Sequence, residues 1–422
     1  MALKLFYMSV GEADQKMLAA VDIKPKFEVI YSREAYGRIL TEDISSKVDL
    51  PPLDFSHFDG YAVRAEDTFC ASIGNPVLVR VVGRIHLGER GERKVNLGET
   101  CYVTTGAFLP EGANAVMMAE ETAIVKSDVI KVCRAMQVGE NVIPAGEDVK
   151  KDETVLEKGH VLRAQDIGLL AALRIGKVTV YRRPIVAIIS TGDELTVRIE
   201  GDKPDKVVNS HSLVISELVK ESGGVPVELG IVPDDLAKIK EKIEEGLRKA
   251  DIVLTIGGCS LGEKDFVPRA VNLIGNPGVI IRGIKIKPGR VSSLGVVNGK
   301  PIVMLPGLIQ STIVGFHVFA LPLIRLASGL PSKSIPPTLS AKISENVSFR
   351  SFTSFQQVTF VRIEKEKNRF IAEPISGESS LLSVLVNADG FIVTPENKPA
   401  IEKWEEVDVH LLNFSPFSTI PS

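Results

Sequence analysis

The sequence predicts a multidomain chain in which a mostly parallel α/β domain is joined to β-rich domains. Two observations lead to this fold class. Between residues 185 and 327, runs of apolar residues alternate with amphipathic helices, as in parallel sheets that are covered by helices. On both sides of that segment, short strand-like runs are separated by glycine-rich turns, which indicates smaller β-rich domains. With 422 residues, 44% of them hydrophobic, the chain is long enough for roughly three to four domains with separate cores.

The N-terminal segment carries helical signals. Ser9 is followed three residues later by Glu12, which is the capping-box pattern that starts a helix. A short helix is therefore predicted over residues 9–20, and residues 30–43 are predicted to continue as helix.

Changes in residue composition and pattern divide the remainder of the chain into domains. Residues 75–142 contain strand-like runs broken by turns, and Pro331, Pro336 and Pro337 mark a boundary after the last predicted helix of the α/β segment. The predicted domains are a mixed helical and extended N-terminal linker domain (1–50 and 145–180), a β-rich domain that includes the Asp59 loop (51–144), an α/β domain (181–330) and a C-terminal β-barrel (336–412).

The later elements follow from local patterns. The predicted strands of the α/β domain are residues 185–190, 227–232, 252–256, 279–284 and 302–305. Between them, a helix over 236–250 carries its apolar residues on one face. The linker domain is predicted to contain a helix at 165–173 and a strand at 178–181, and the C-terminal barrel strands at 357–363, 370–373, 391–394 and 407–411.

Composition excludes several classes of partner. The net charge of -3 provides no basic field for nucleic acid. The longest apolar stretch, residues 313–327, is interrupted by His317, Pro322 and Arg325 and is shorter than the ~20 residues of a membrane span, so a buried helix is predicted. The four cysteines form no CxxC pair, which indicates reduced thiols and a cytoplasmic protein.

One loop stands out at the start of the predicted β-rich domain. Pro51, Pro52 and the pair Asp59-Gly60 mark a shaped loop, and Asp59 immediately precedes an extended run. An Asp-Gly pair alone is an ordinary turn. In this loop, the Asp59 carboxylate is placed to hold a cation or a proton at the edge of a domain.

Polar residues follow the predicted parallel strands, where ligands of such sheets bind. They are Ser190, Thr191, Gly192, Asp193 and Glu194 after the first strand, Asp234 and Asp235 after the second, Gly257, Gly258, Ser260, Gly262 and Asp265 after the third, Lys287 and Arg290 after the fourth, and Pro306 and Gly307 after the fifth. The three glycines free backbone amides for an anion, and Asp265 can reach a metal. Carboxylates for Mg²⁺ together with fixed cations for phosphate oxygens suit pyrophosphate chemistry.

Each of these groups has a plainer interpretation on its own. Asp234 and Asp235 are typical caps of the next helix, and a lone Gly-Gly pair is a weak phosphate signal. Asp193 and Glu194 could be solvated on a loop. Their joint placement on successive strand ends favours the functional interpretation.

Several of these runs resemble one family. Residues 51–64, PPLDFSHFDGYAVR, resemble a signature of the molybdopterin molybdenumtransferases, the MoeA and gephyrin E-domain family. Further similar motifs are TTGAFLP (104–110), GED (146–148), TGDEL (191–195), GIVPDD (230–235), the GGxSxGxxD loop (257–265), residues 379–390 and VTPE (393–396). Because the matches run in the family's order from about residue 9 to 410, the resemblance covers nearly the whole chain.

The resemblance implies a four-domain, elongated chain that forms a homodimer. In that dimer, Asp59, Thr105 and Asp148 face the strand-end site of the partner's third domain. The family's reaction takes adenylylated molybdopterin and molybdate or tungstate, cleaves the pyrophosphate link with Mg²⁺ and releases AMP. A transient contact with the adenylating protein of the same pathway is also implied.

Residue roles carry over where the motifs match. The implied Mg²⁺ and water-orienting carboxylates are Asp59, Asp148, Glu194, Asp234 and Asp265. Thr105 would hydrogen-bond a phosphate or oxyanion, and Lys287 would neutralise charge that develops at the cleaved link. The implied ligand-binding residues are Ser190, Thr191, Gly192, Gly257, Gly258, Ser260, Gly262, Arg290, Pro306, Gly307 and Ser311.

Four positions depart from the family pattern. Arg290-Val291 stands where the family has Lys-Pro, Leu308-Ile309 where it has Asn-Pro, and Ile143-Pro144 where it has an arginine. Gly283 stands where the family has a lysine, and the neighbouring Arg282 and Lys285 are candidates to replace that charge. These losses at the ligand rim leave open an alternative, a non-catalytic or weakly catalytic paralogue that binds molybdopterin or a protein partner as a dimeric scaffold. The intact carboxylate set favours the enzyme, because clustered carboxylates repel one another unless a cation uses them.

Overall fold

The computed structural model describes residues 5–89, 94–198, 206–260, 265–332, 339–349, 351–367 and 369–412. The chain divides into two units. Unit 1 comprises Met1–Glu28 and Tyr181–Ser422, and unit 2 comprises Val29–Val180. Unit 2 is therefore a continuous segment inserted between two parts of unit 1.

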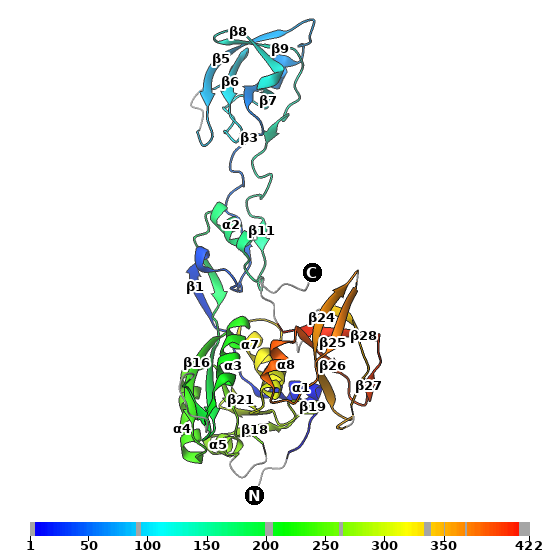
Figure 1. Cartoon of the computed structure of the whole chain (residues 1–422). Helices are drawn as coiled ribbons and strands as arrows, with labels where there is room; N and C mark the ends of the chain where they lie inside the picture. Colours follow the sequence, from blue (N-terminus) through cyan, green and yellow to red (C-terminus); the bar gives the residue numbers. More distant parts are fainter. Residues whose placement is uncertain are drawn as a thin grey trace. The chain divides into compact units, whose positions relative to one another are not determined.

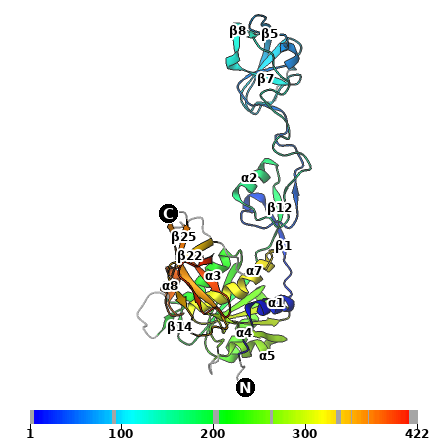
Figure 2. The ribbon, with the colours of Figure 1, turned by 90° about the vertical axis from the view of Figure 1, so that its right-hand side faces the viewer.

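The first helix belongs to unit 1. Helix α1 (Val10–Ala20) begins with the predicted capping box, in which the Ser9 hydroxyl accepts from the Glu12 amide and the Glu12 carboxylate accepts from the Ser9 amide. Its buried residues Ala13 and Met17 join the same core as residues 186–391 of unit 1. Figure 2 shows α1, in dark blue, beside the green and yellow elements of that unit.

A six-stranded sheet forms the centre of unit 1. In spatial order its strands are β16 (Val225–Val232), β13 (Ile185–Thr191), β17 (Ile252–Ile256), β21 (Lys300–Leu305), β20 (Ser293–Val297) and β18 (Pro277–Arg282). The first four strands run parallel, which confirms the mostly parallel sheet. Strand β20, which the sequence pattern did not reveal, pairs antiparallel with both β21 and β18. Since two reversals cancel, β18 points the same way as the parallel strands, and its carboxyl end lies at the same edge.

Helices cover both faces of this sheet, as expected from strands whose residues are apolar on both sides. One face packs against α1, α3 (Ser210–Glu221) and the helix built from α6 (Ile309–Gly315), the π-helical turn η4 (Phe316–Ala320) and α7 (Leu321–Ala327). The other packs against α4 (Leu236–Lys249) and α5 (Val267–Ile274), which Figure 1 shows side by side.

The apolar stretch predicted as a buried helix is confirmed as one. Among the described residues, Ile309–Ala327 is the one helix whose length and mean hydropathy of 1.4 would suffice to cross a membrane. Within the fold, 83% of that stretch is buried. Phe316 and Phe319 contribute to the core of unit 1, so the apolar character serves packing.

The C-terminal domain is the predicted barrel. Its strands β24 (Gln356–Glu366), β25 (Arg369–Pro374), β22 (Leu339–Ile343), β28 (Glu406–Leu411) and β26 (Gly390–Thr394) pair in this order, and β26 pairs back to β24 to close the barrel. The short strand β19 (Ile286–Lys287) pairs in parallel with the start of β24 and so links the α/β domain to the barrel. The remaining short elements of unit 1 are α8 (Leu382–Val386), β14 (Leu195–Thr196), β15 (Val207–Val208), β23 (Val347–Ser348) and β27 (Ala400–Ile401).

Unit 2 contains the predicted β-rich sheet. Its strands, in spatial order, are β7 (Ala115–Met118), β4 (Gly60–Val63), β6 (Glu99–Val103), β5 (Val77–Ile85), β9 (Val129–Val132) and β8 (Thr122–Lys126). A second core surrounds α2 (Ala164–Ala172). The other elements are β1 (Phe27–Tyr31), β2 (Ile44–Ser45), β3 (Phe55–Ser56), β10 (Val142–Ile143), β11 (Thr154–Leu156), β12 (Lys177–Tyr181), η1 (Ser32–Glu34), η2 (Ala65–Thr68) and η3 (Ala119–Glu121).

The helix predicted over residues 30–43 is wrong. The backbone amides there bond to distant partners, since Gly37 donates to the Leu162 carbonyl and Leu40 donates to the His160 carbonyl. Such long-range pairing overrides local helical preference.

Candidate active site

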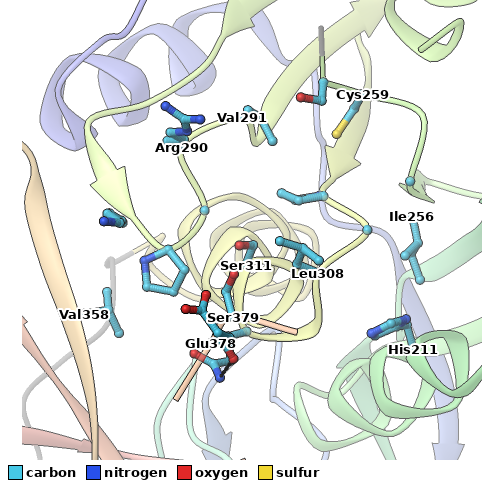
Figure 3. Close-up of a pocket in the computed structure, with 18 of the residues that line it drawn as sticks. His211, Ile256, Cys259, Arg290, Val291, Leu308, Ser311, Val358, Glu378 and Ser379 are labelled. Atoms are coloured by element: carbon cyan, nitrogen blue, oxygen red, sulfur yellow. Dashed lines mark hydrogen bonds between the residues drawn. The ribbon is translucent and has the colours of Figure 1, made fainter. Parts of the chain in front are cut away.

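A cavity of about 980 Å³ lies where the carboxyl ends of the parallel strands meet the C-terminal barrel. This volume is within the range of about 300 to 1,000 Å³ that is typical of small-molecule and cofactor sites. The sheet side supplies Thr191 and Ile256 at the ends of β13 and β17, and the barrel supplies Phe360 from β24. Figure 3 shows residues from both sides around the end of the helix that carries Leu308 and Ser311.

Most of the strand-end residues named from the sequence line this cavity. They are Thr191, Gly192, Glu194, Asp234, Gly257, Gly258, Ser260, Asp265, Lys287, Arg290, Pro306, Gly307 and Ser311. Ser190 is not among them, because it is buried and its hydroxyl donates to the Asn209 side-chain oxygen at 3.1 Å. Gly262 lies outside the described residues.

Gly257 and Gly258 act through close packing. Both have positive φ, and a Cβ on Gly257 would lie 2.8 Å from the Thr191 carbonyl oxygen, while one on Gly258 would lie 2.8 Å from the Thr191 hydroxyl oxygen. The Gly257 amide donates to the Leu305 carbonyl at 3.0 Å, so it is not free for an anion as the sequence suggested. The glycines bring the loop after β17 against the end of β13.

The two adjacent aspartates after β16 have separate roles. Asp235 caps α4, because its side chain accepts from the Lys238 amide at 2.9 Å. Asp234 lines the cavity with Glu194 and Asp265. The capping interpretation therefore holds for Asp235, and Asp234 contributes its carboxylate to the cavity wall.

The carboxylates of this cavity fit Mg²⁺. Mg²⁺ prefers oxygen ligands, keeps several waters and is bound by one or two carboxylates together with substrate phosphates. Glu194, Asp234 and Asp265 supply such oxygens. Across the described ranges, no three His, Cys, Asp or Glu side chains form a group that could hold a metal ion by themselves.

Arg282 is hydrogen-bonded to the start of the loop that follows β17. Its buried guanidinium donates through Nη1 to the Cys259 carbonyl and through Nη2 to the Ser260 carbonyl, the latter at 2.5 Å. Burial lowers the pKa of Arg282. Because the guanidinium is committed to these carbonyls, Arg282 orients the loop and does not replace the lysine that the family has at Gly283.

The barrel wall of the cavity was not foreseen from the sequence. Gln310, in the first turn of α6, donates through its side chain to the Glu378 carbonyl at 2.8 Å, and its backbone amide donates to the Ser379 carbonyl at 3.1 Å. Figure 3 shows Glu378 and Ser379 near the end of this helix. The similarity of residues 379–390 to the family's fourth-domain motif was the one available signal, and it did not indicate contact with the α/β domain.

Two further lining residues have altered acidity. Burial raises the pKa of the Cys259 thiol to about 12, so this cysteine remains protonated near neutral pH. Burial lowers the pKa of His211, which favours its neutral form. None of the four cysteines is in a disulfide, as expected.

Unit 2 carries a second group of residues named from the sequence. Asp59 Oδ1 accepts from the Thr105 amide at 2.6 Å and from the Thr105 hydroxyl at 2.9 Å. These bonds, the amide first, lower the pKa of Asp59. Asp54 accepts from the Ala145 amide at 2.8 Å, which brings the Asp59 loop beside the segment that leads to Asp148.

Comparisons with known proteins agree with this geometry. Residues 8–173 match the family described as "MoeA N-terminal region (domain I and II)", residues 187–326 match "Probable molybdopterin binding domain", and residues 347–412 match "MoeA C-terminal region (domain IV)". The chain is 30% identical to the molybdopterin molybdenumtransferase of Bacillus subtilis, covering 91% of this chain and 90% of that one. It is 36% identical to a molybdopterin biosynthesis protein of Methanocaldococcus jannaschii, covering 94% and 95% of the two chains.

A solved structure gives the same result for the fold. The MoeA protein of Pyrococcus horikoshii, titled a molybdopterin biosynthesis protein, superposes with a TM-score of 0.86 at 32% identity, covering 97% of this chain and 100% of that chain. Sequence relatives, family matches and fold therefore converge, and the chain belongs to the molybdopterin molybdenumtransferase family, the enzymes of molybdenum cofactor biosynthesis that include MoeA.

Proposed function

We propose that this enzyme inserts molybdate or tungstate into adenylylated molybdopterin, with Mg²⁺-dependent release of AMP. The observation that carries the proposal is the composition of the cavity lining. Glu194, Asp234 and Asp265 line the same cavity as Lys287 and Arg290, and a pyrophosphate-linked ligand with a hard cation requires both kinds of group. Relatives that bear the molybdenumtransferase name support the same reaction.

Glu194, Asp234 and Asp265 would hold Mg²⁺ together with the phosphate oxygens of the substrate. Bound Mg²⁺ supplies Lewis-acid polarisation of the phosphoryl oxygens. Lys287 neutralises charge on the leaving phosphate, and Arg290, with its planar guanidinium, binds phosphate oxygens in pairs. The bond from Arg282 to the Ser260 carbonyl holds Ser260 in the cavity lining.

Asp59, Thr105 and Asp148 are proposed to complete the reaction from unit 2 of the other protomer in a homodimer. Both Thr105 donors are committed to Asp59, so Thr105 sets the orientation and charge of that carboxylate. Asp59 then orients water or Mg²⁺, and Asp148 supplies a further carboxylate. A cytoplasmic location, supported by four cysteines that are not in disulfides, and a transient contact with the adenylating protein are also proposed.

The test is anaerobic incubation of the protein with adenylylated molybdopterin and each oxyanion, with and without Mg²⁺, followed by measurement of AMP. Release of AMP that requires both Mg²⁺ and an oxyanion is the expected result. Comparing molybdate with tungstate identifies the preferred substrate. If the protein binds adenylylated molybdopterin but releases no AMP under any of these conditions, the chain is a binding paralogue of the family.

A further inference from the structure

Phe352 of the C-terminal domain lies in the cavity wall with two cations against its ring. Lys287 Nζ is 5.3 Å from the ring centroid, and Arg290 Cζ is 4.9 Å from it. Both distances are within the reach of a cation–π contact. Lys287 Nζ also donates to the Ser351 hydroxyl at 2.8 Å. The two cations named for phosphate binding are therefore held by a residue from the other domain.

The backbone fixes the position of this ring. Phe352 has a φ of 57°, a left-handed conformation that large side chains rarely adopt and that persists only when the surroundings hold it. Gln357 provides such a hold, because its side chain donates to the Phe352 carbonyl at 2.7 Å. The ring also lies 5.1 Å from the ring of Phe355, which lies 5.0 Å from that of Tyr7.

The contacts have an electrostatic consequence. Lys287 and Arg290 repel each other, and long cationic side chains lose conformational freedom when they bind an anion. The negative face of an aromatic ring attracts both cations and orders them before the ligand arrives. We propose that Phe352 is a positioning residue that holds Lys287 and Arg290 together for the phosphate groups of the ligand, so that the C-terminal domain sets the anion affinity of the cavity.

This inference rests on the proposed function for the nature of the ligand. It also gives a physical reason why this chain has Arg290 at a position where the family has a lysine. The guanidinium at Arg290 is well suited to stacking on a ring, which an ammonium does less well.

The same domain offers a matched control. Trp404 also has a left-handed φ, of 70°, and also lies against two cations, with Arg369 Cζ at 5.4 Å and Lys403 Nζ at 5.1 Å from its ring. It is 45% exposed, against 39% for Phe352, and it does not line the cavity. Changing Trp404 removes an equivalent arrangement without touching the ligand site.

The experiment measures inorganic pyrophosphate binding to the full-length protein by isothermal titration calorimetry, for wild type, Phe352→Leu, Phe352→Tyr and Trp404→Leu. Phe352→Leu keeps the apolar bulk but removes the ring, and should weaken binding about tenfold. Phe352→Tyr keeps the ring and should bind within about twofold of wild type. Trp404→Leu should bind as wild type does. Thermal melting of each variant shows that the fold is retained.

Kinetics of AMP release provide a second readout. Because the ring orders the two cations that contact the phosphate groups, Phe352→Leu should raise KM for adenylylated molybdopterin and lower kcat/KM about tenfold, whereas Trp404→Leu should change neither. Equal pyrophosphate affinity in wild type and Phe352→Leu would overturn the inference. So would an equal loss in Phe352→Tyr, an equal loss in Trp404→Leu, or a wild-type protein that does not bind pyrophosphate. The proposed function fails separately, if wild type binds pyrophosphate with the expected dependence on Phe352 but releases no AMP.

Discussion

The pair Asp59 and Thr105 shows how a single neighbour sets the charge state of a carboxylate. Asp59 is exposed, yet its pKa is lowered because the Thr105 amide and hydroxyl both donate to Oδ1. A lowered folded-state pKa means that the charge is present at neutral pH and is lost only when the pH falls below the ordinary range for aspartate. The two Thr105 donors therefore favour the ionised form of Asp59.

We predict that Thr105→Val raises the pKa of Asp59 toward its ordinary value, because one of the two donors is removed. The pH at which AMP release declines on the acid side should rise accordingly, and Asp59→Ala should reduce AMP release about a hundredfold or more. Carboxyl NMR titration and a pH profile of AMP release measure the two effects. Thr104→Val is the matched control, since the buried Thr104 hydroxyl has no hydrogen-bond partner among the described residues. An acid limb that is the same in Thr105→Val and wild type would show that Asp59 does not govern it.

A second prediction at this scale concerns Cys259, which lies in the ligand loop but is 2% exposed. Its pKa of about 12 keeps the thiol neutral, so it cannot act as a thiolate nucleophile near pH 7. Cys259→Ser should leave AMP release within about tenfold of wild type. In native protein, iodoacetamide should modify the exposed Cys70 and spare Cys259, as peptide mass mapping can show. A loss of AMP release far above tenfold would assign the thiol a part in the reaction.

At the scale of elements, the start of α6 is unusual for a helix that faces a ligand. Leu308 is its N-cap residue and makes no side-chain capping bond, although asparagine or serine is preferred there. Leu308 is 48% exposed in the cavity wall, whereas Ile309 is buried. The departure from the family pattern thus costs this helix a cap and removes an amide from the cavity.

We predict that Leu308→Asn raises the free energy of unfolding by about 0.5 to 2 kcal/mol and tightens binding of adenylylated molybdopterin. Denaturant unfolding and ligand titration measure these effects. Leu381→Asn is the matched control, because Leu381 is the uncapped N-cap of α8 and lies outside the cavity lining. It should add stability without changing ligand affinity. If Leu308→Asn also leaves affinity unchanged, the missing amide does not limit binding.

Elements with a strong local signal were predictable from the sequence. The capping box of Ser9 and Glu12 located α1, and apolar runs located the parallel strands. Strand β20 was missed, although every one of its residues is buried, because its short run Ser293–Val297 contains serine and glycine. The segment after Tyr31 was misjudged because its partners lie more than a hundred residues further along the chain.

The part of the candidate site that the sheet supplies was also predictable from the sequence. Strand ends converge by topology, so residues such as Glu194 and Asp265 could be placed together from the order of the strands. The barrel side could not, because the contact between Lys287 and Phe352 depends on how two separate domains pack. The local sequence around Lys287 or Phe352 does not predict that these two residues are in contact.

At the scale of the whole molecule, the proposed homodimer makes a quantitative prediction. Asp59 belongs to unit 2 and Asp265 to unit 1. If each reaction uses Asp59 of one protomer and Asp265 of the other, mixing inactive Asp59→Ala with inactive Asp265→Ala yields mixed dimers with one intact site. After subunit exchange, AMP release should recover to about a quarter of wild type, by random pairing of two-fold dimers. Light scattering should show a dimer, and an active strict monomer would rule out the shared site.

The insertion of unit 2 within unit 1 affects the order in which the protein can fold during synthesis. Helix α1 leaves the ribosome first, but the strands and helices that bury Ala13 and Met17 follow only after residue 181. Unit 2 is a continuous segment and can fold while the rest is still being made, since domains fold as units from the N-terminal side. The earliest helix of the chain must therefore wait, with its apolar face unburied, until the sheet of unit 1 is complete.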